Sequence, residues 1–87
     1  MASLTKKMVI KSKQGLHARP AALFVQTASK FDSLITVRKG KDEVSGKSIM
    51  GILMLGAEKD SVIFVRAEGV DAQNALEELE KLVTKEE

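Results

Sequence analysis

The chain has 87 residues, of which 44% are apolar and 30% charged, with no cysteine and a single histidine. A chain of this length buries only about 60% of its unfolded surface, so we expect one domain over residues 1–87 and exclude a multidomain enzyme. The cysteine and histidine counts exclude disulfide scaffolds and an ordinary zinc site, and we expect neither a metal nor a cofactor. No apolar run has the length of a membrane span or a signal peptide, which predicts a cytoplasmic protein without membrane insertion.

The net charge of +2 is unevenly distributed along the chain. Residues 1–47 hold ten Lys or Arg against three Asp or Glu, whereas residues 48–87 hold four against nine. A basic half is typical of proteins that bind nucleic acid or an acidic partner surface. The chain has no Trp or Tyr and only three Phe to stack on bases, which favours an acidic partner.

Hydrophobic periodicity and turn residues predict seven elements in the order βαββαβα. In chain order we expect a strand over residues 4–11, a helix over 18–30, strands over 34–38 and 42–45, a helix over 49–55, a strand over 61–68 and a helix from residue 72 onwards. The connections are too short for repeated βαβ units. They favour an α+β fold with an antiparallel sheet covered on one face by helices.

Capping residues predict where the helices begin and end. Pro20 is tolerated only in the first turn of a helix, which places the start of the first helix next to His17. Ser48 and Asp71 suit the N-cap positions of the second and third helices, and Gly56 suits the end of the second. The apolar stripe of the first helix is expected at Ala21, Ala22, Val25, Ala28 and Phe31.

The segment 15–21 (Gly-Leu-His-Ala-Arg-Pro-Ala) contains the only histidine and is the strongest candidate for a functional site. His17 lies at or next to the helix N-cap, where several backbone N–H groups have no acceptor within the helix. The positive helix end and Arg19 both favour a bound phosphate and a neutral, nucleophilic imidazole. His17 is therefore a candidate phosphoryl acceptor with Arg19 as its phosphate partner. The alternative is a polar cap beside a solvated charge.

The segment around Ser48 is a second candidate site. Residues 46–48 (Gly-Lys-Ser) are similar to the end of a nucleotide-binding loop, but the first glycine of that motif is out of place. A phosphate on Ser48 would be electrostatically favourable at a helix N-terminus, whereas an ordinary cap would carry no modification. The helix that follows is more apolar than one core face requires, which suits either an adaptable contact surface or the filling of the core, and core filling is the commoner explanation. We expect outward side chains at Ile49 and Met50 and inward ones at Leu53 and Leu55.

Two motifs give the chain a specific resemblance to a known family. Segments 15–21 and 47–51 (Lys-Ser-Ile-Met-Gly) have the family's spacing, and segments 24–31 and 67–69 also fit. The chain resembles HPr, the histidine-containing phosphocarrier of the bacterial sugar phosphotransferase system, over nearly its whole length. The resemblance implies an open-faced β-sandwich, with a four-stranded antiparallel sheet and three helices on one face. It also implies a phosphoryl carrier rather than a turnover enzyme.

The resemblance implies a role for each candidate residue. His17 would accept a phosphoryl group from enzyme I and pass it to the A domains of enzyme II components, with Arg19 holding the phosphate. The second motif looks like the Gram-positive branch, in which HPr kinase/phosphorylase would phosphorylate Ser48. That phosphate would weaken phosphorylation of His17 and create a partner for a catabolite repressor. The partner-binding surface would contain Lys47, Ile49, Met50 and Met54.

Basic residues expected around the site would attract acidic partner surfaces, an attraction that weakens as salt rises. These residues are Lys13, Arg19, Lys30 and Lys47. One departure from the family pattern bears on the regulatory site. Ser45-Gly46 replaces a more usual Asn followed by an aliphatic residue or Ala, and we expect it to loosen the entry to the second helix.

Two alternatives from other classes remain open. The first is a regulatory HPr-like module that acts mainly as a corepressor through phosphorylated Ser48; the presence of His17 argues against it, because the regulatory relative of HPr has Gln there. The second is a small basic nucleic-acid binder, which the missing aromatic residues and the acidic last helix disfavour. We expect a monomer, with exchange of the strand at residues 4–11 as the route to a dimer.

Overall fold

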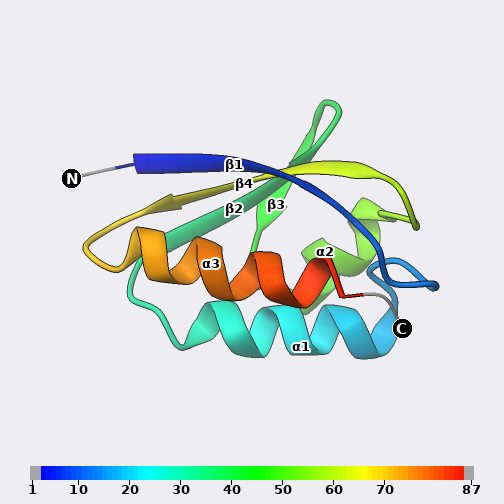
Figure 1. Cartoon of the computed structure of the whole chain (residues 1–87), viewed down its shortest axis with the longest axis horizontal. Helices are drawn as coiled ribbons and strands as arrows, with labels where there is room; N and C mark the ends of the chain where they lie inside the picture. The colour runs from blue at the N-terminus through cyan, green and yellow to red at the C-terminus, as the bar shows by residue number, and fades with distance from the viewer. Residues whose placement is uncertain (1–2, 86–87) are drawn as a thin grey trace.

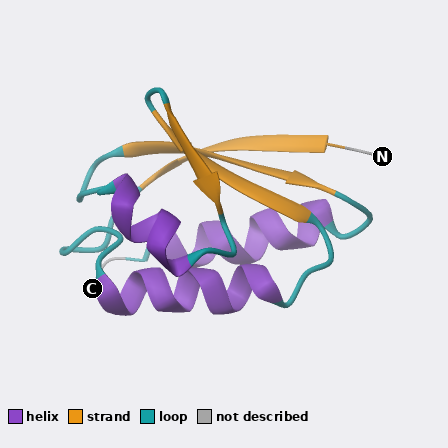
Figure 2. Ribbon diagram, turned by 180° about the vertical axis from the view of Figure 1, so that it is seen from behind, coloured by secondary structure: helices purple, strands orange, loops and turns teal. Residues whose placement is uncertain are grey.

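The computed structural model describes residues 3–85 and contains the seven expected elements in the order βαββαβα. Figure 1 shows the strands as one layer and the helices as a second layer below it. Seen from behind, all three helices lie on the same side of the sheet, so the other side of the sheet is open (Figure 2). The elements are β1 (Ser3–Val9), α1 (Ala18–Ser29), β2 (Leu34–Lys39), β3 (Asp42–Ser45), α2 (Ile49–Leu55), β4 (Val62–Glu68) and α3 (Ala72–Val83). The predicted open-faced sandwich is confirmed.

The sheet has the strand order β1-β4-β2-β3, and every neighbouring pair is antiparallel. The last strand in the chain, β4, therefore lies in the middle, between β1 and β2. In its register Val65 pairs with Lys6 on one side and with Val37 on the other. No helix within residues 3–85 has the length and apolar character to cross a membrane.

The core fills the space between the sheet and the helices. Alternation along β4 places Ile63, Val65 and Ala67 on the inner face, as its period of two predicts, and all three are buried. Phe24 is the largest fully buried side chain, although it was absent from the predicted stripe of α1. Its spacing of three from Ala21 and four from Ala28 puts it on the same helix face as these two residues.

The predicted bounds of α2 are confirmed at both ends. Ser48 Oγ accepts a hydrogen bond from the Gly51 N–H at 3.0 Å, and Gly56 closes the helix. The expected inward position of Leu53 was wrong, because its side chain is 37% exposed. The inner face is set instead by Ile52 and Leu55, which are three residues apart and both buried.

Asp71 occupies the predicted N-cap of α3, but its side chain makes no capping bond. The carboxylate accepts hydrogen bonds from the Asp32 N–H at 2.8 Å, the Ser33 N–H at 3.0 Å and the Ser33 hydroxyl. These bonds, the one from the Ser33 hydroxyl foremost, hold the pKa of Asp71 below its usual 3.8. Asp71 thus joins the loop before β2 to the loop before α3, and Ser33 is buried beneath this contact.

Replacing Asp71 with Asn should lower the urea midpoint at pH 7 and have a smaller effect at pH 3. Because the folded pKa is below the unfolded value, the carboxylate stabilises the fold above about pH 4, and this contribution is lost as the pH falls through the folded pKa. Urea unfolding of both proteins at the two pH values measures the difference between the wild-type and variant midpoints. Asp42→Asn, an exposed change on β3, is the control and should keep the wild-type midpoint. An equal difference in midpoint at both pH values would contradict the conclusion that the ionised carboxylate of Asp71 stabilises the fold.

Candidate functional site

His17 is the N-cap of α1 and has extended backbone angles of φ −87° and ψ −166°. Pro20 is the third helical residue, so the prediction that it marks the first turn is confirmed. The His17 carbonyl accepts the Ala21 N–H at 2.7 Å and closes that turn. Its imidazole is exposed and makes no hydrogen bond with any residue between 3 and 85. The first N–H groups of the helix therefore keep no intrahelical acceptor beside an accessible ring nitrogen.

The segment before His17 is fixed against the loop between α2 and β4. The Leu16 N–H donates to the Ala57 carbonyl at 2.8 Å, and the Leu16 side chain is buried. Gly15 has φ +66°, and a Cβ there would overlap the Ala57 carbonyl oxygen and lie 2.7 Å from Cα of Glu58. Only glycine allows this approach, so the position of His17 depends on contact between two loops about forty residues apart in the chain.

His17 lines a shallow, open depression of about 310 Å³. The depression is also lined by Lys13 and Gln14 from the preceding loop and by Glu58 and Lys59 from the loop after α2. Two lysines and one carboxylate give it a net positive charge, which suits a phosphoryl group. Sequence reasoning missed Glu58 and Lys59, since only the contact between the two loops brings them to the histidine.

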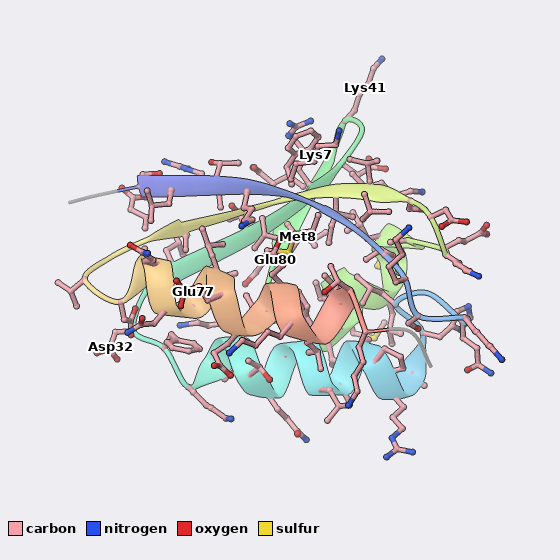
Figure 3. All side chains as sticks on the ribbon, viewed as in Figure 1. Lys7, Met8, Asp32, Lys41, Glu77 and Glu80 are labelled. Carbon is pink, nitrogen blue, oxygen red and sulfur yellow. The ribbon has the colours of Figure 1, made fainter. Side chains whose placement is uncertain are left out.

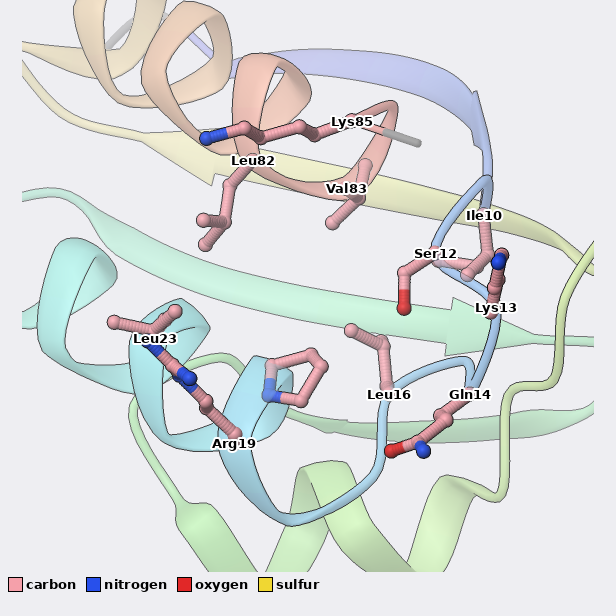
Figure 4. Close-up of a pocket in the computed structure, with 11 residues that line it drawn as sticks. Ile10, Ser12, Lys13, Gln14, Leu16, Arg19, Leu23, Leu82, Val83 and Lys85 are labelled. Carbon is pink, nitrogen blue, oxygen red and sulfur yellow. The ribbon is translucent and has the colours of Figure 1, made fainter. Parts of the chain in front are cut away.

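Arg19 does not share this depression with His17. It lines a neighbouring pocket of about 470 Å³ between the start of α1 and the end of α3. Figure 4 shows its side chain running along α1 toward Leu23 and away from Gln14. Two residues along a helix turn a side chain well away from the first position, which accounts for the separation. Arg19 makes no hydrogen bond or ion pair within the described chain, so no contact of this kind holds its guanidinium there.

Ser45 and Gly46 both make hydrogen bonds at the entry to α2. The Gly46 N–H donates to the Ile35 carbonyl at 2.7 Å, and a Cβ at Gly46 would lie 2.5 Å from the Ile35 side chain. The Lys47 N–H donates to Ser45 Oγ at 3.1 Å. Ser48 is half-buried as the cap of α2. Both departing residues thus make contacts within the turn, and the looser entry relative to other family members stays a prediction.

The outer side of α2 carries a continuous set of exposed apolar side chains, which we call the α2 surface. It comprises Ile49, Met50, Leu53 and Met54. Three of the residues predicted to bind partners, Ile49, Met50 and Met54, thus lie on one exposed helix face. Gly51 faces the other way, since a Cβ there would lie 3.0 Å from the Val44 Cβ on β3. Its small size serves packing within the fold.

Two of the four basic residues expected around His17 lie elsewhere. Lys30 is the C-cap of α1, and a 12-residue helix separates it from His17 by about 18 Å. The Lys47 Nζ donates to the Phe31 carbonyl at 2.7 Å, which places Lys47 at the same far end of α1. The expectation was wrong for both, because sequence distance alone does not show which end of a helix a later loop reaches. Lys13 and Lys59 provide the positive charge beside the imidazole.

The fold and the site together define a class of protein. The protein is a small open-faced sandwich with an exposed histidine at a helix N-terminus, and the described part of the chain has no cluster of metal-ligating side chains. A family profile described as "PTS HPr component phosphorylation site" matches residues 4–85. The chain belongs to this family of HPr phosphocarriers and is of the Gram-positive type.

Individual relatives are similar to the chain over almost its whole length. The HPr-like protein Crh of Halalkalibacterium halodurans is 46% identical over 93% of this chain and 96% of its own. The crystal structure of phosphocarrier protein HPr from Bacillus anthracis has a TM-score of 0.92 and 44% identity, covering 95% of this chain and 99% of that one. Crh from Bacillus subtilis, described as a domain-swapped dimer, has a TM-score of 0.77 and 41% identity over 94% of both chains.

Proposed function

We propose that this chain is a phosphoryl carrier that takes a phosphoryl group from enzyme I on His17 and passes it to the A domains of enzyme II. The observation that carries the proposal is the exposed imidazole at the start of α1, beside the positive depression that contains Lys13 and Lys59. We further propose that residues 1–87 form a single, monomeric, cytoplasmic HPr domain. It turns over no substrate of its own, because each phosphoryl group leaves on the next partner.

The geometry suits transfer in both directions. A nitrogen of His17 attacks the phosphorus, and the N–P bond forms as the bond from phosphorus to the donor breaks. The resulting phosphate lies at a helix N-terminus, where unpaired N–H groups and the helix dipole favour negative charge. Because the site is shallow and open, a second nucleophile can reach the phosphorus and accept it. A deeply buried phosphate would be stable but could not be handed on.

The test of this proposal is the intact mass of the protein after incubation with phosphoenolpyruvate and enzyme I. We expect a gain of about 80 Da, one phosphate, that is lost on acid treatment because the N–P bond is acid-labile. No gain with an enzyme I that phosphorylates a known HPr would contradict the carrier function.

Arg19 is proposed to hold the phosphate after its unpartnered side chain turns from Leu23 toward His17. Replacement with Lys should slow phosphate uptake roughly tenfold, because an ammonium group cannot form two parallel bonds to phosphate oxygens. Arg38→Lys is the control: Arg38 stacks 4.5 Å from the Phe64 ring on the open side of the sheet and should leave uptake unchanged. Stopped-flow or quenched transfer from phosphorylated enzyme I measures the rates. Equal rates for Arg19→Lys and wild type would remove Arg19 from the mechanism.

Ser48 is proposed to be the regulatory site of HPr kinase/phosphorylase, and its phosphorylated form the partner of a catabolite repressor. The 7-residue helix α2 runs from Ser48 to the loop that supports His17 and is about 10 Å long. This length is close to the screening length of physiological salt. A phosphate on Ser48 therefore acts through a partner that covers both sites, which would also contact Lys47 and the α2 surface. Acidic partners would be repelled by its added charge of about −1.5 to −2.

Ser48→Asp should slow phosphate uptake from enzyme I several-fold, because the added charge repels an acidic partner. Ser48→Asn is the matched control, since Asn is an equally good N-cap without charge and should retain the wild-type rate. Initial rates from phosphorylated enzyme I at low salt compare the two. Identical slowing of both variants would point to a damaged cap and contradict the electrostatic explanation.

A regulatory role is a second candidate function with specific support, because a relative that is 46% identical to this chain is the HPr-like protein Crh. In this alternative the chain acts mainly as a corepressor through phosphorylated Ser48. His17 distinguishes the two functions, since a module with only the regulatory role would take up no acid-labile phosphate. The mass experiment above therefore separates them.

A further inference from the structure

The accessible sulfur of the described chain is confined to one helix face. The sequence has four methionines and no cysteine. Met8 is 2% exposed and points from β1 into the space between the sheet and the helices (Figure 3). Met50 and Met54 are 62% and 78% exposed, and their spacing of four puts them side by side on the α2 surface.

These two thioethers contribute little to the core. The side chains that anchor α2 are Ile52 and Leu55, both buried. A chemical change at Met50 or Met54 therefore alters the surface that a partner would contact and leaves the packing between α2 and the sheet intact. Met8 differs, because a polar group there would enter the core.

We propose that Met50 and Met54 form a reversible oxidation site that weakens the α2 surface for its partners. The inference rests on the proposed function, in which a partner covers this surface. A sulfur lone pair attacks one oxygen of hydrogen peroxide, the S–O bond forms and the O–O bond breaks. The proton on the attacked oxygen passes to the departing hydroxide, which leaves as water. Sulfur is oxidised by two electrons and the peroxide is reduced. Methionine sulfoxide reductases, using a thiol reductant, reverse the change.

The effect on binding follows from the polarity of the product. A thioether adapts its shape to an apolar partner surface, whereas a sulfoxide carries a strong acceptor that must lose water when it is covered. Met50 is two residues beyond Ser48, so oxidation and phosphorylation would modify the same contact region. Oxidation would therefore slow uptake of phosphate on His17 without touching the imidazole.

The first measurement is the order in which the methionines react. The full chain is treated with increasing hydrogen peroxide and mapped by peptide mass spectrometry. We expect Met50 and Met54 to gain oxygen at doses that leave Met8 unmodified, with no change in the melting temperature. Oxidation of Met8 at the same dose as Met50 and Met54 would overturn the proposed site.

The second measurement is the rate of phosphate uptake from phosphorylated enzyme I before and after peroxide. Wild-type protein should become roughly tenfold slower, and sulfoxide reductase should restore its rate. The double variant Met50→Leu/Met54→Leu should keep its own starting rate after peroxide, while Met8→Leu should slow as wild type does. An unchanged wild-type rate with both residues oxidised would overturn the inference. Absence of uptake before peroxide would overturn the proposed function instead, and the peptide map would still test the oxidation site.

Discussion

Replacing His17 with alanine is expected to abolish acid-labile phosphorylation while leaving the fold intact. In the proposed function the imidazole supplies the attacking nitrogen, and the sequence contains no second histidine to replace it. Loss of the nucleophile removes the reaction itself, so the expected effect exceeds that of any change in a phosphate-binding side chain. The side chain is exposed and makes no capping bond, so the melting temperature should stay close to that of wild type.

The measurement is intact mass after incubation with phosphoenolpyruvate and enzyme I. Ser48→Ala is the matched control, because it removes the other proposed phosphorylation site and should still gain one acid-labile phosphate. An acid-labile phosphate on the His17→Ala protein would show that the acceptor lies elsewhere. A lowered melting temperature in that variant would contradict the view that His17 has no structural role.

The largest effect on stability is expected from Gly15→Ala. An alanine at φ +66° carries about 1–2 kcal/mol of backbone strain. Its Cβ would also overlap the Ala57 carbonyl, so the loops must separate and the bond from Leu16 to Ala57 is lost. Together these effects should cost at least about 3 kcal/mol. For a domain of this size, each kcal/mol lowers the melting temperature by about 4–8 °C.

Gly40→Ala separates backbone strain from the clash. Gly40 has φ +60°, close to the angle of Gly15, but a Cβ there has nothing within 4 Å. This variant should lose only about 1–2 kcal/mol and should take up phosphate at the wild-type rate. Gly15→Ala should also transfer phosphate more slowly, because His17 moves with its loop. Calorimetry measures the stability of both variants. Equal destabilisation of the two would show that the loop contact contributes nothing to stability.

Local signals predicted most of the elements. The bounds of α2 follow from a cap at Ser48 and a glycine at Gly56, and both signals act within one turn of the helix. The inner face of β4 follows from a period of two. The inward residues of α2 could not be fixed in this way, because nearly every position of that helix is apolar and only packing selects Ile52 over Leu53.

The candidate site was predicted only in part. Proline and histidine within four residues fixed the start of α1, so the position of His17 required no tertiary information. The direction of Arg19 and the approach of Lys59 depend on side-chain rotamers and on the packing of two distant loops. Asp71 shows the same limit: its capping position was predictable, but its bonds to residues 38 and 39 positions earlier were not.

Because β4 lies between β1 and β2, the sheet cannot be completed before β4 has been synthesised. During translation, β2 and β3 can form a hairpin as soon as they emerge, but β1 has no strand to pair with until residues 62–68 are synthesised. Pairing of Ser3 with Glu68 joins two distant parts of the chain, so the sheet is completed by a long-range step. A nascent chain therefore carries His17 long before β1 can pair with β4.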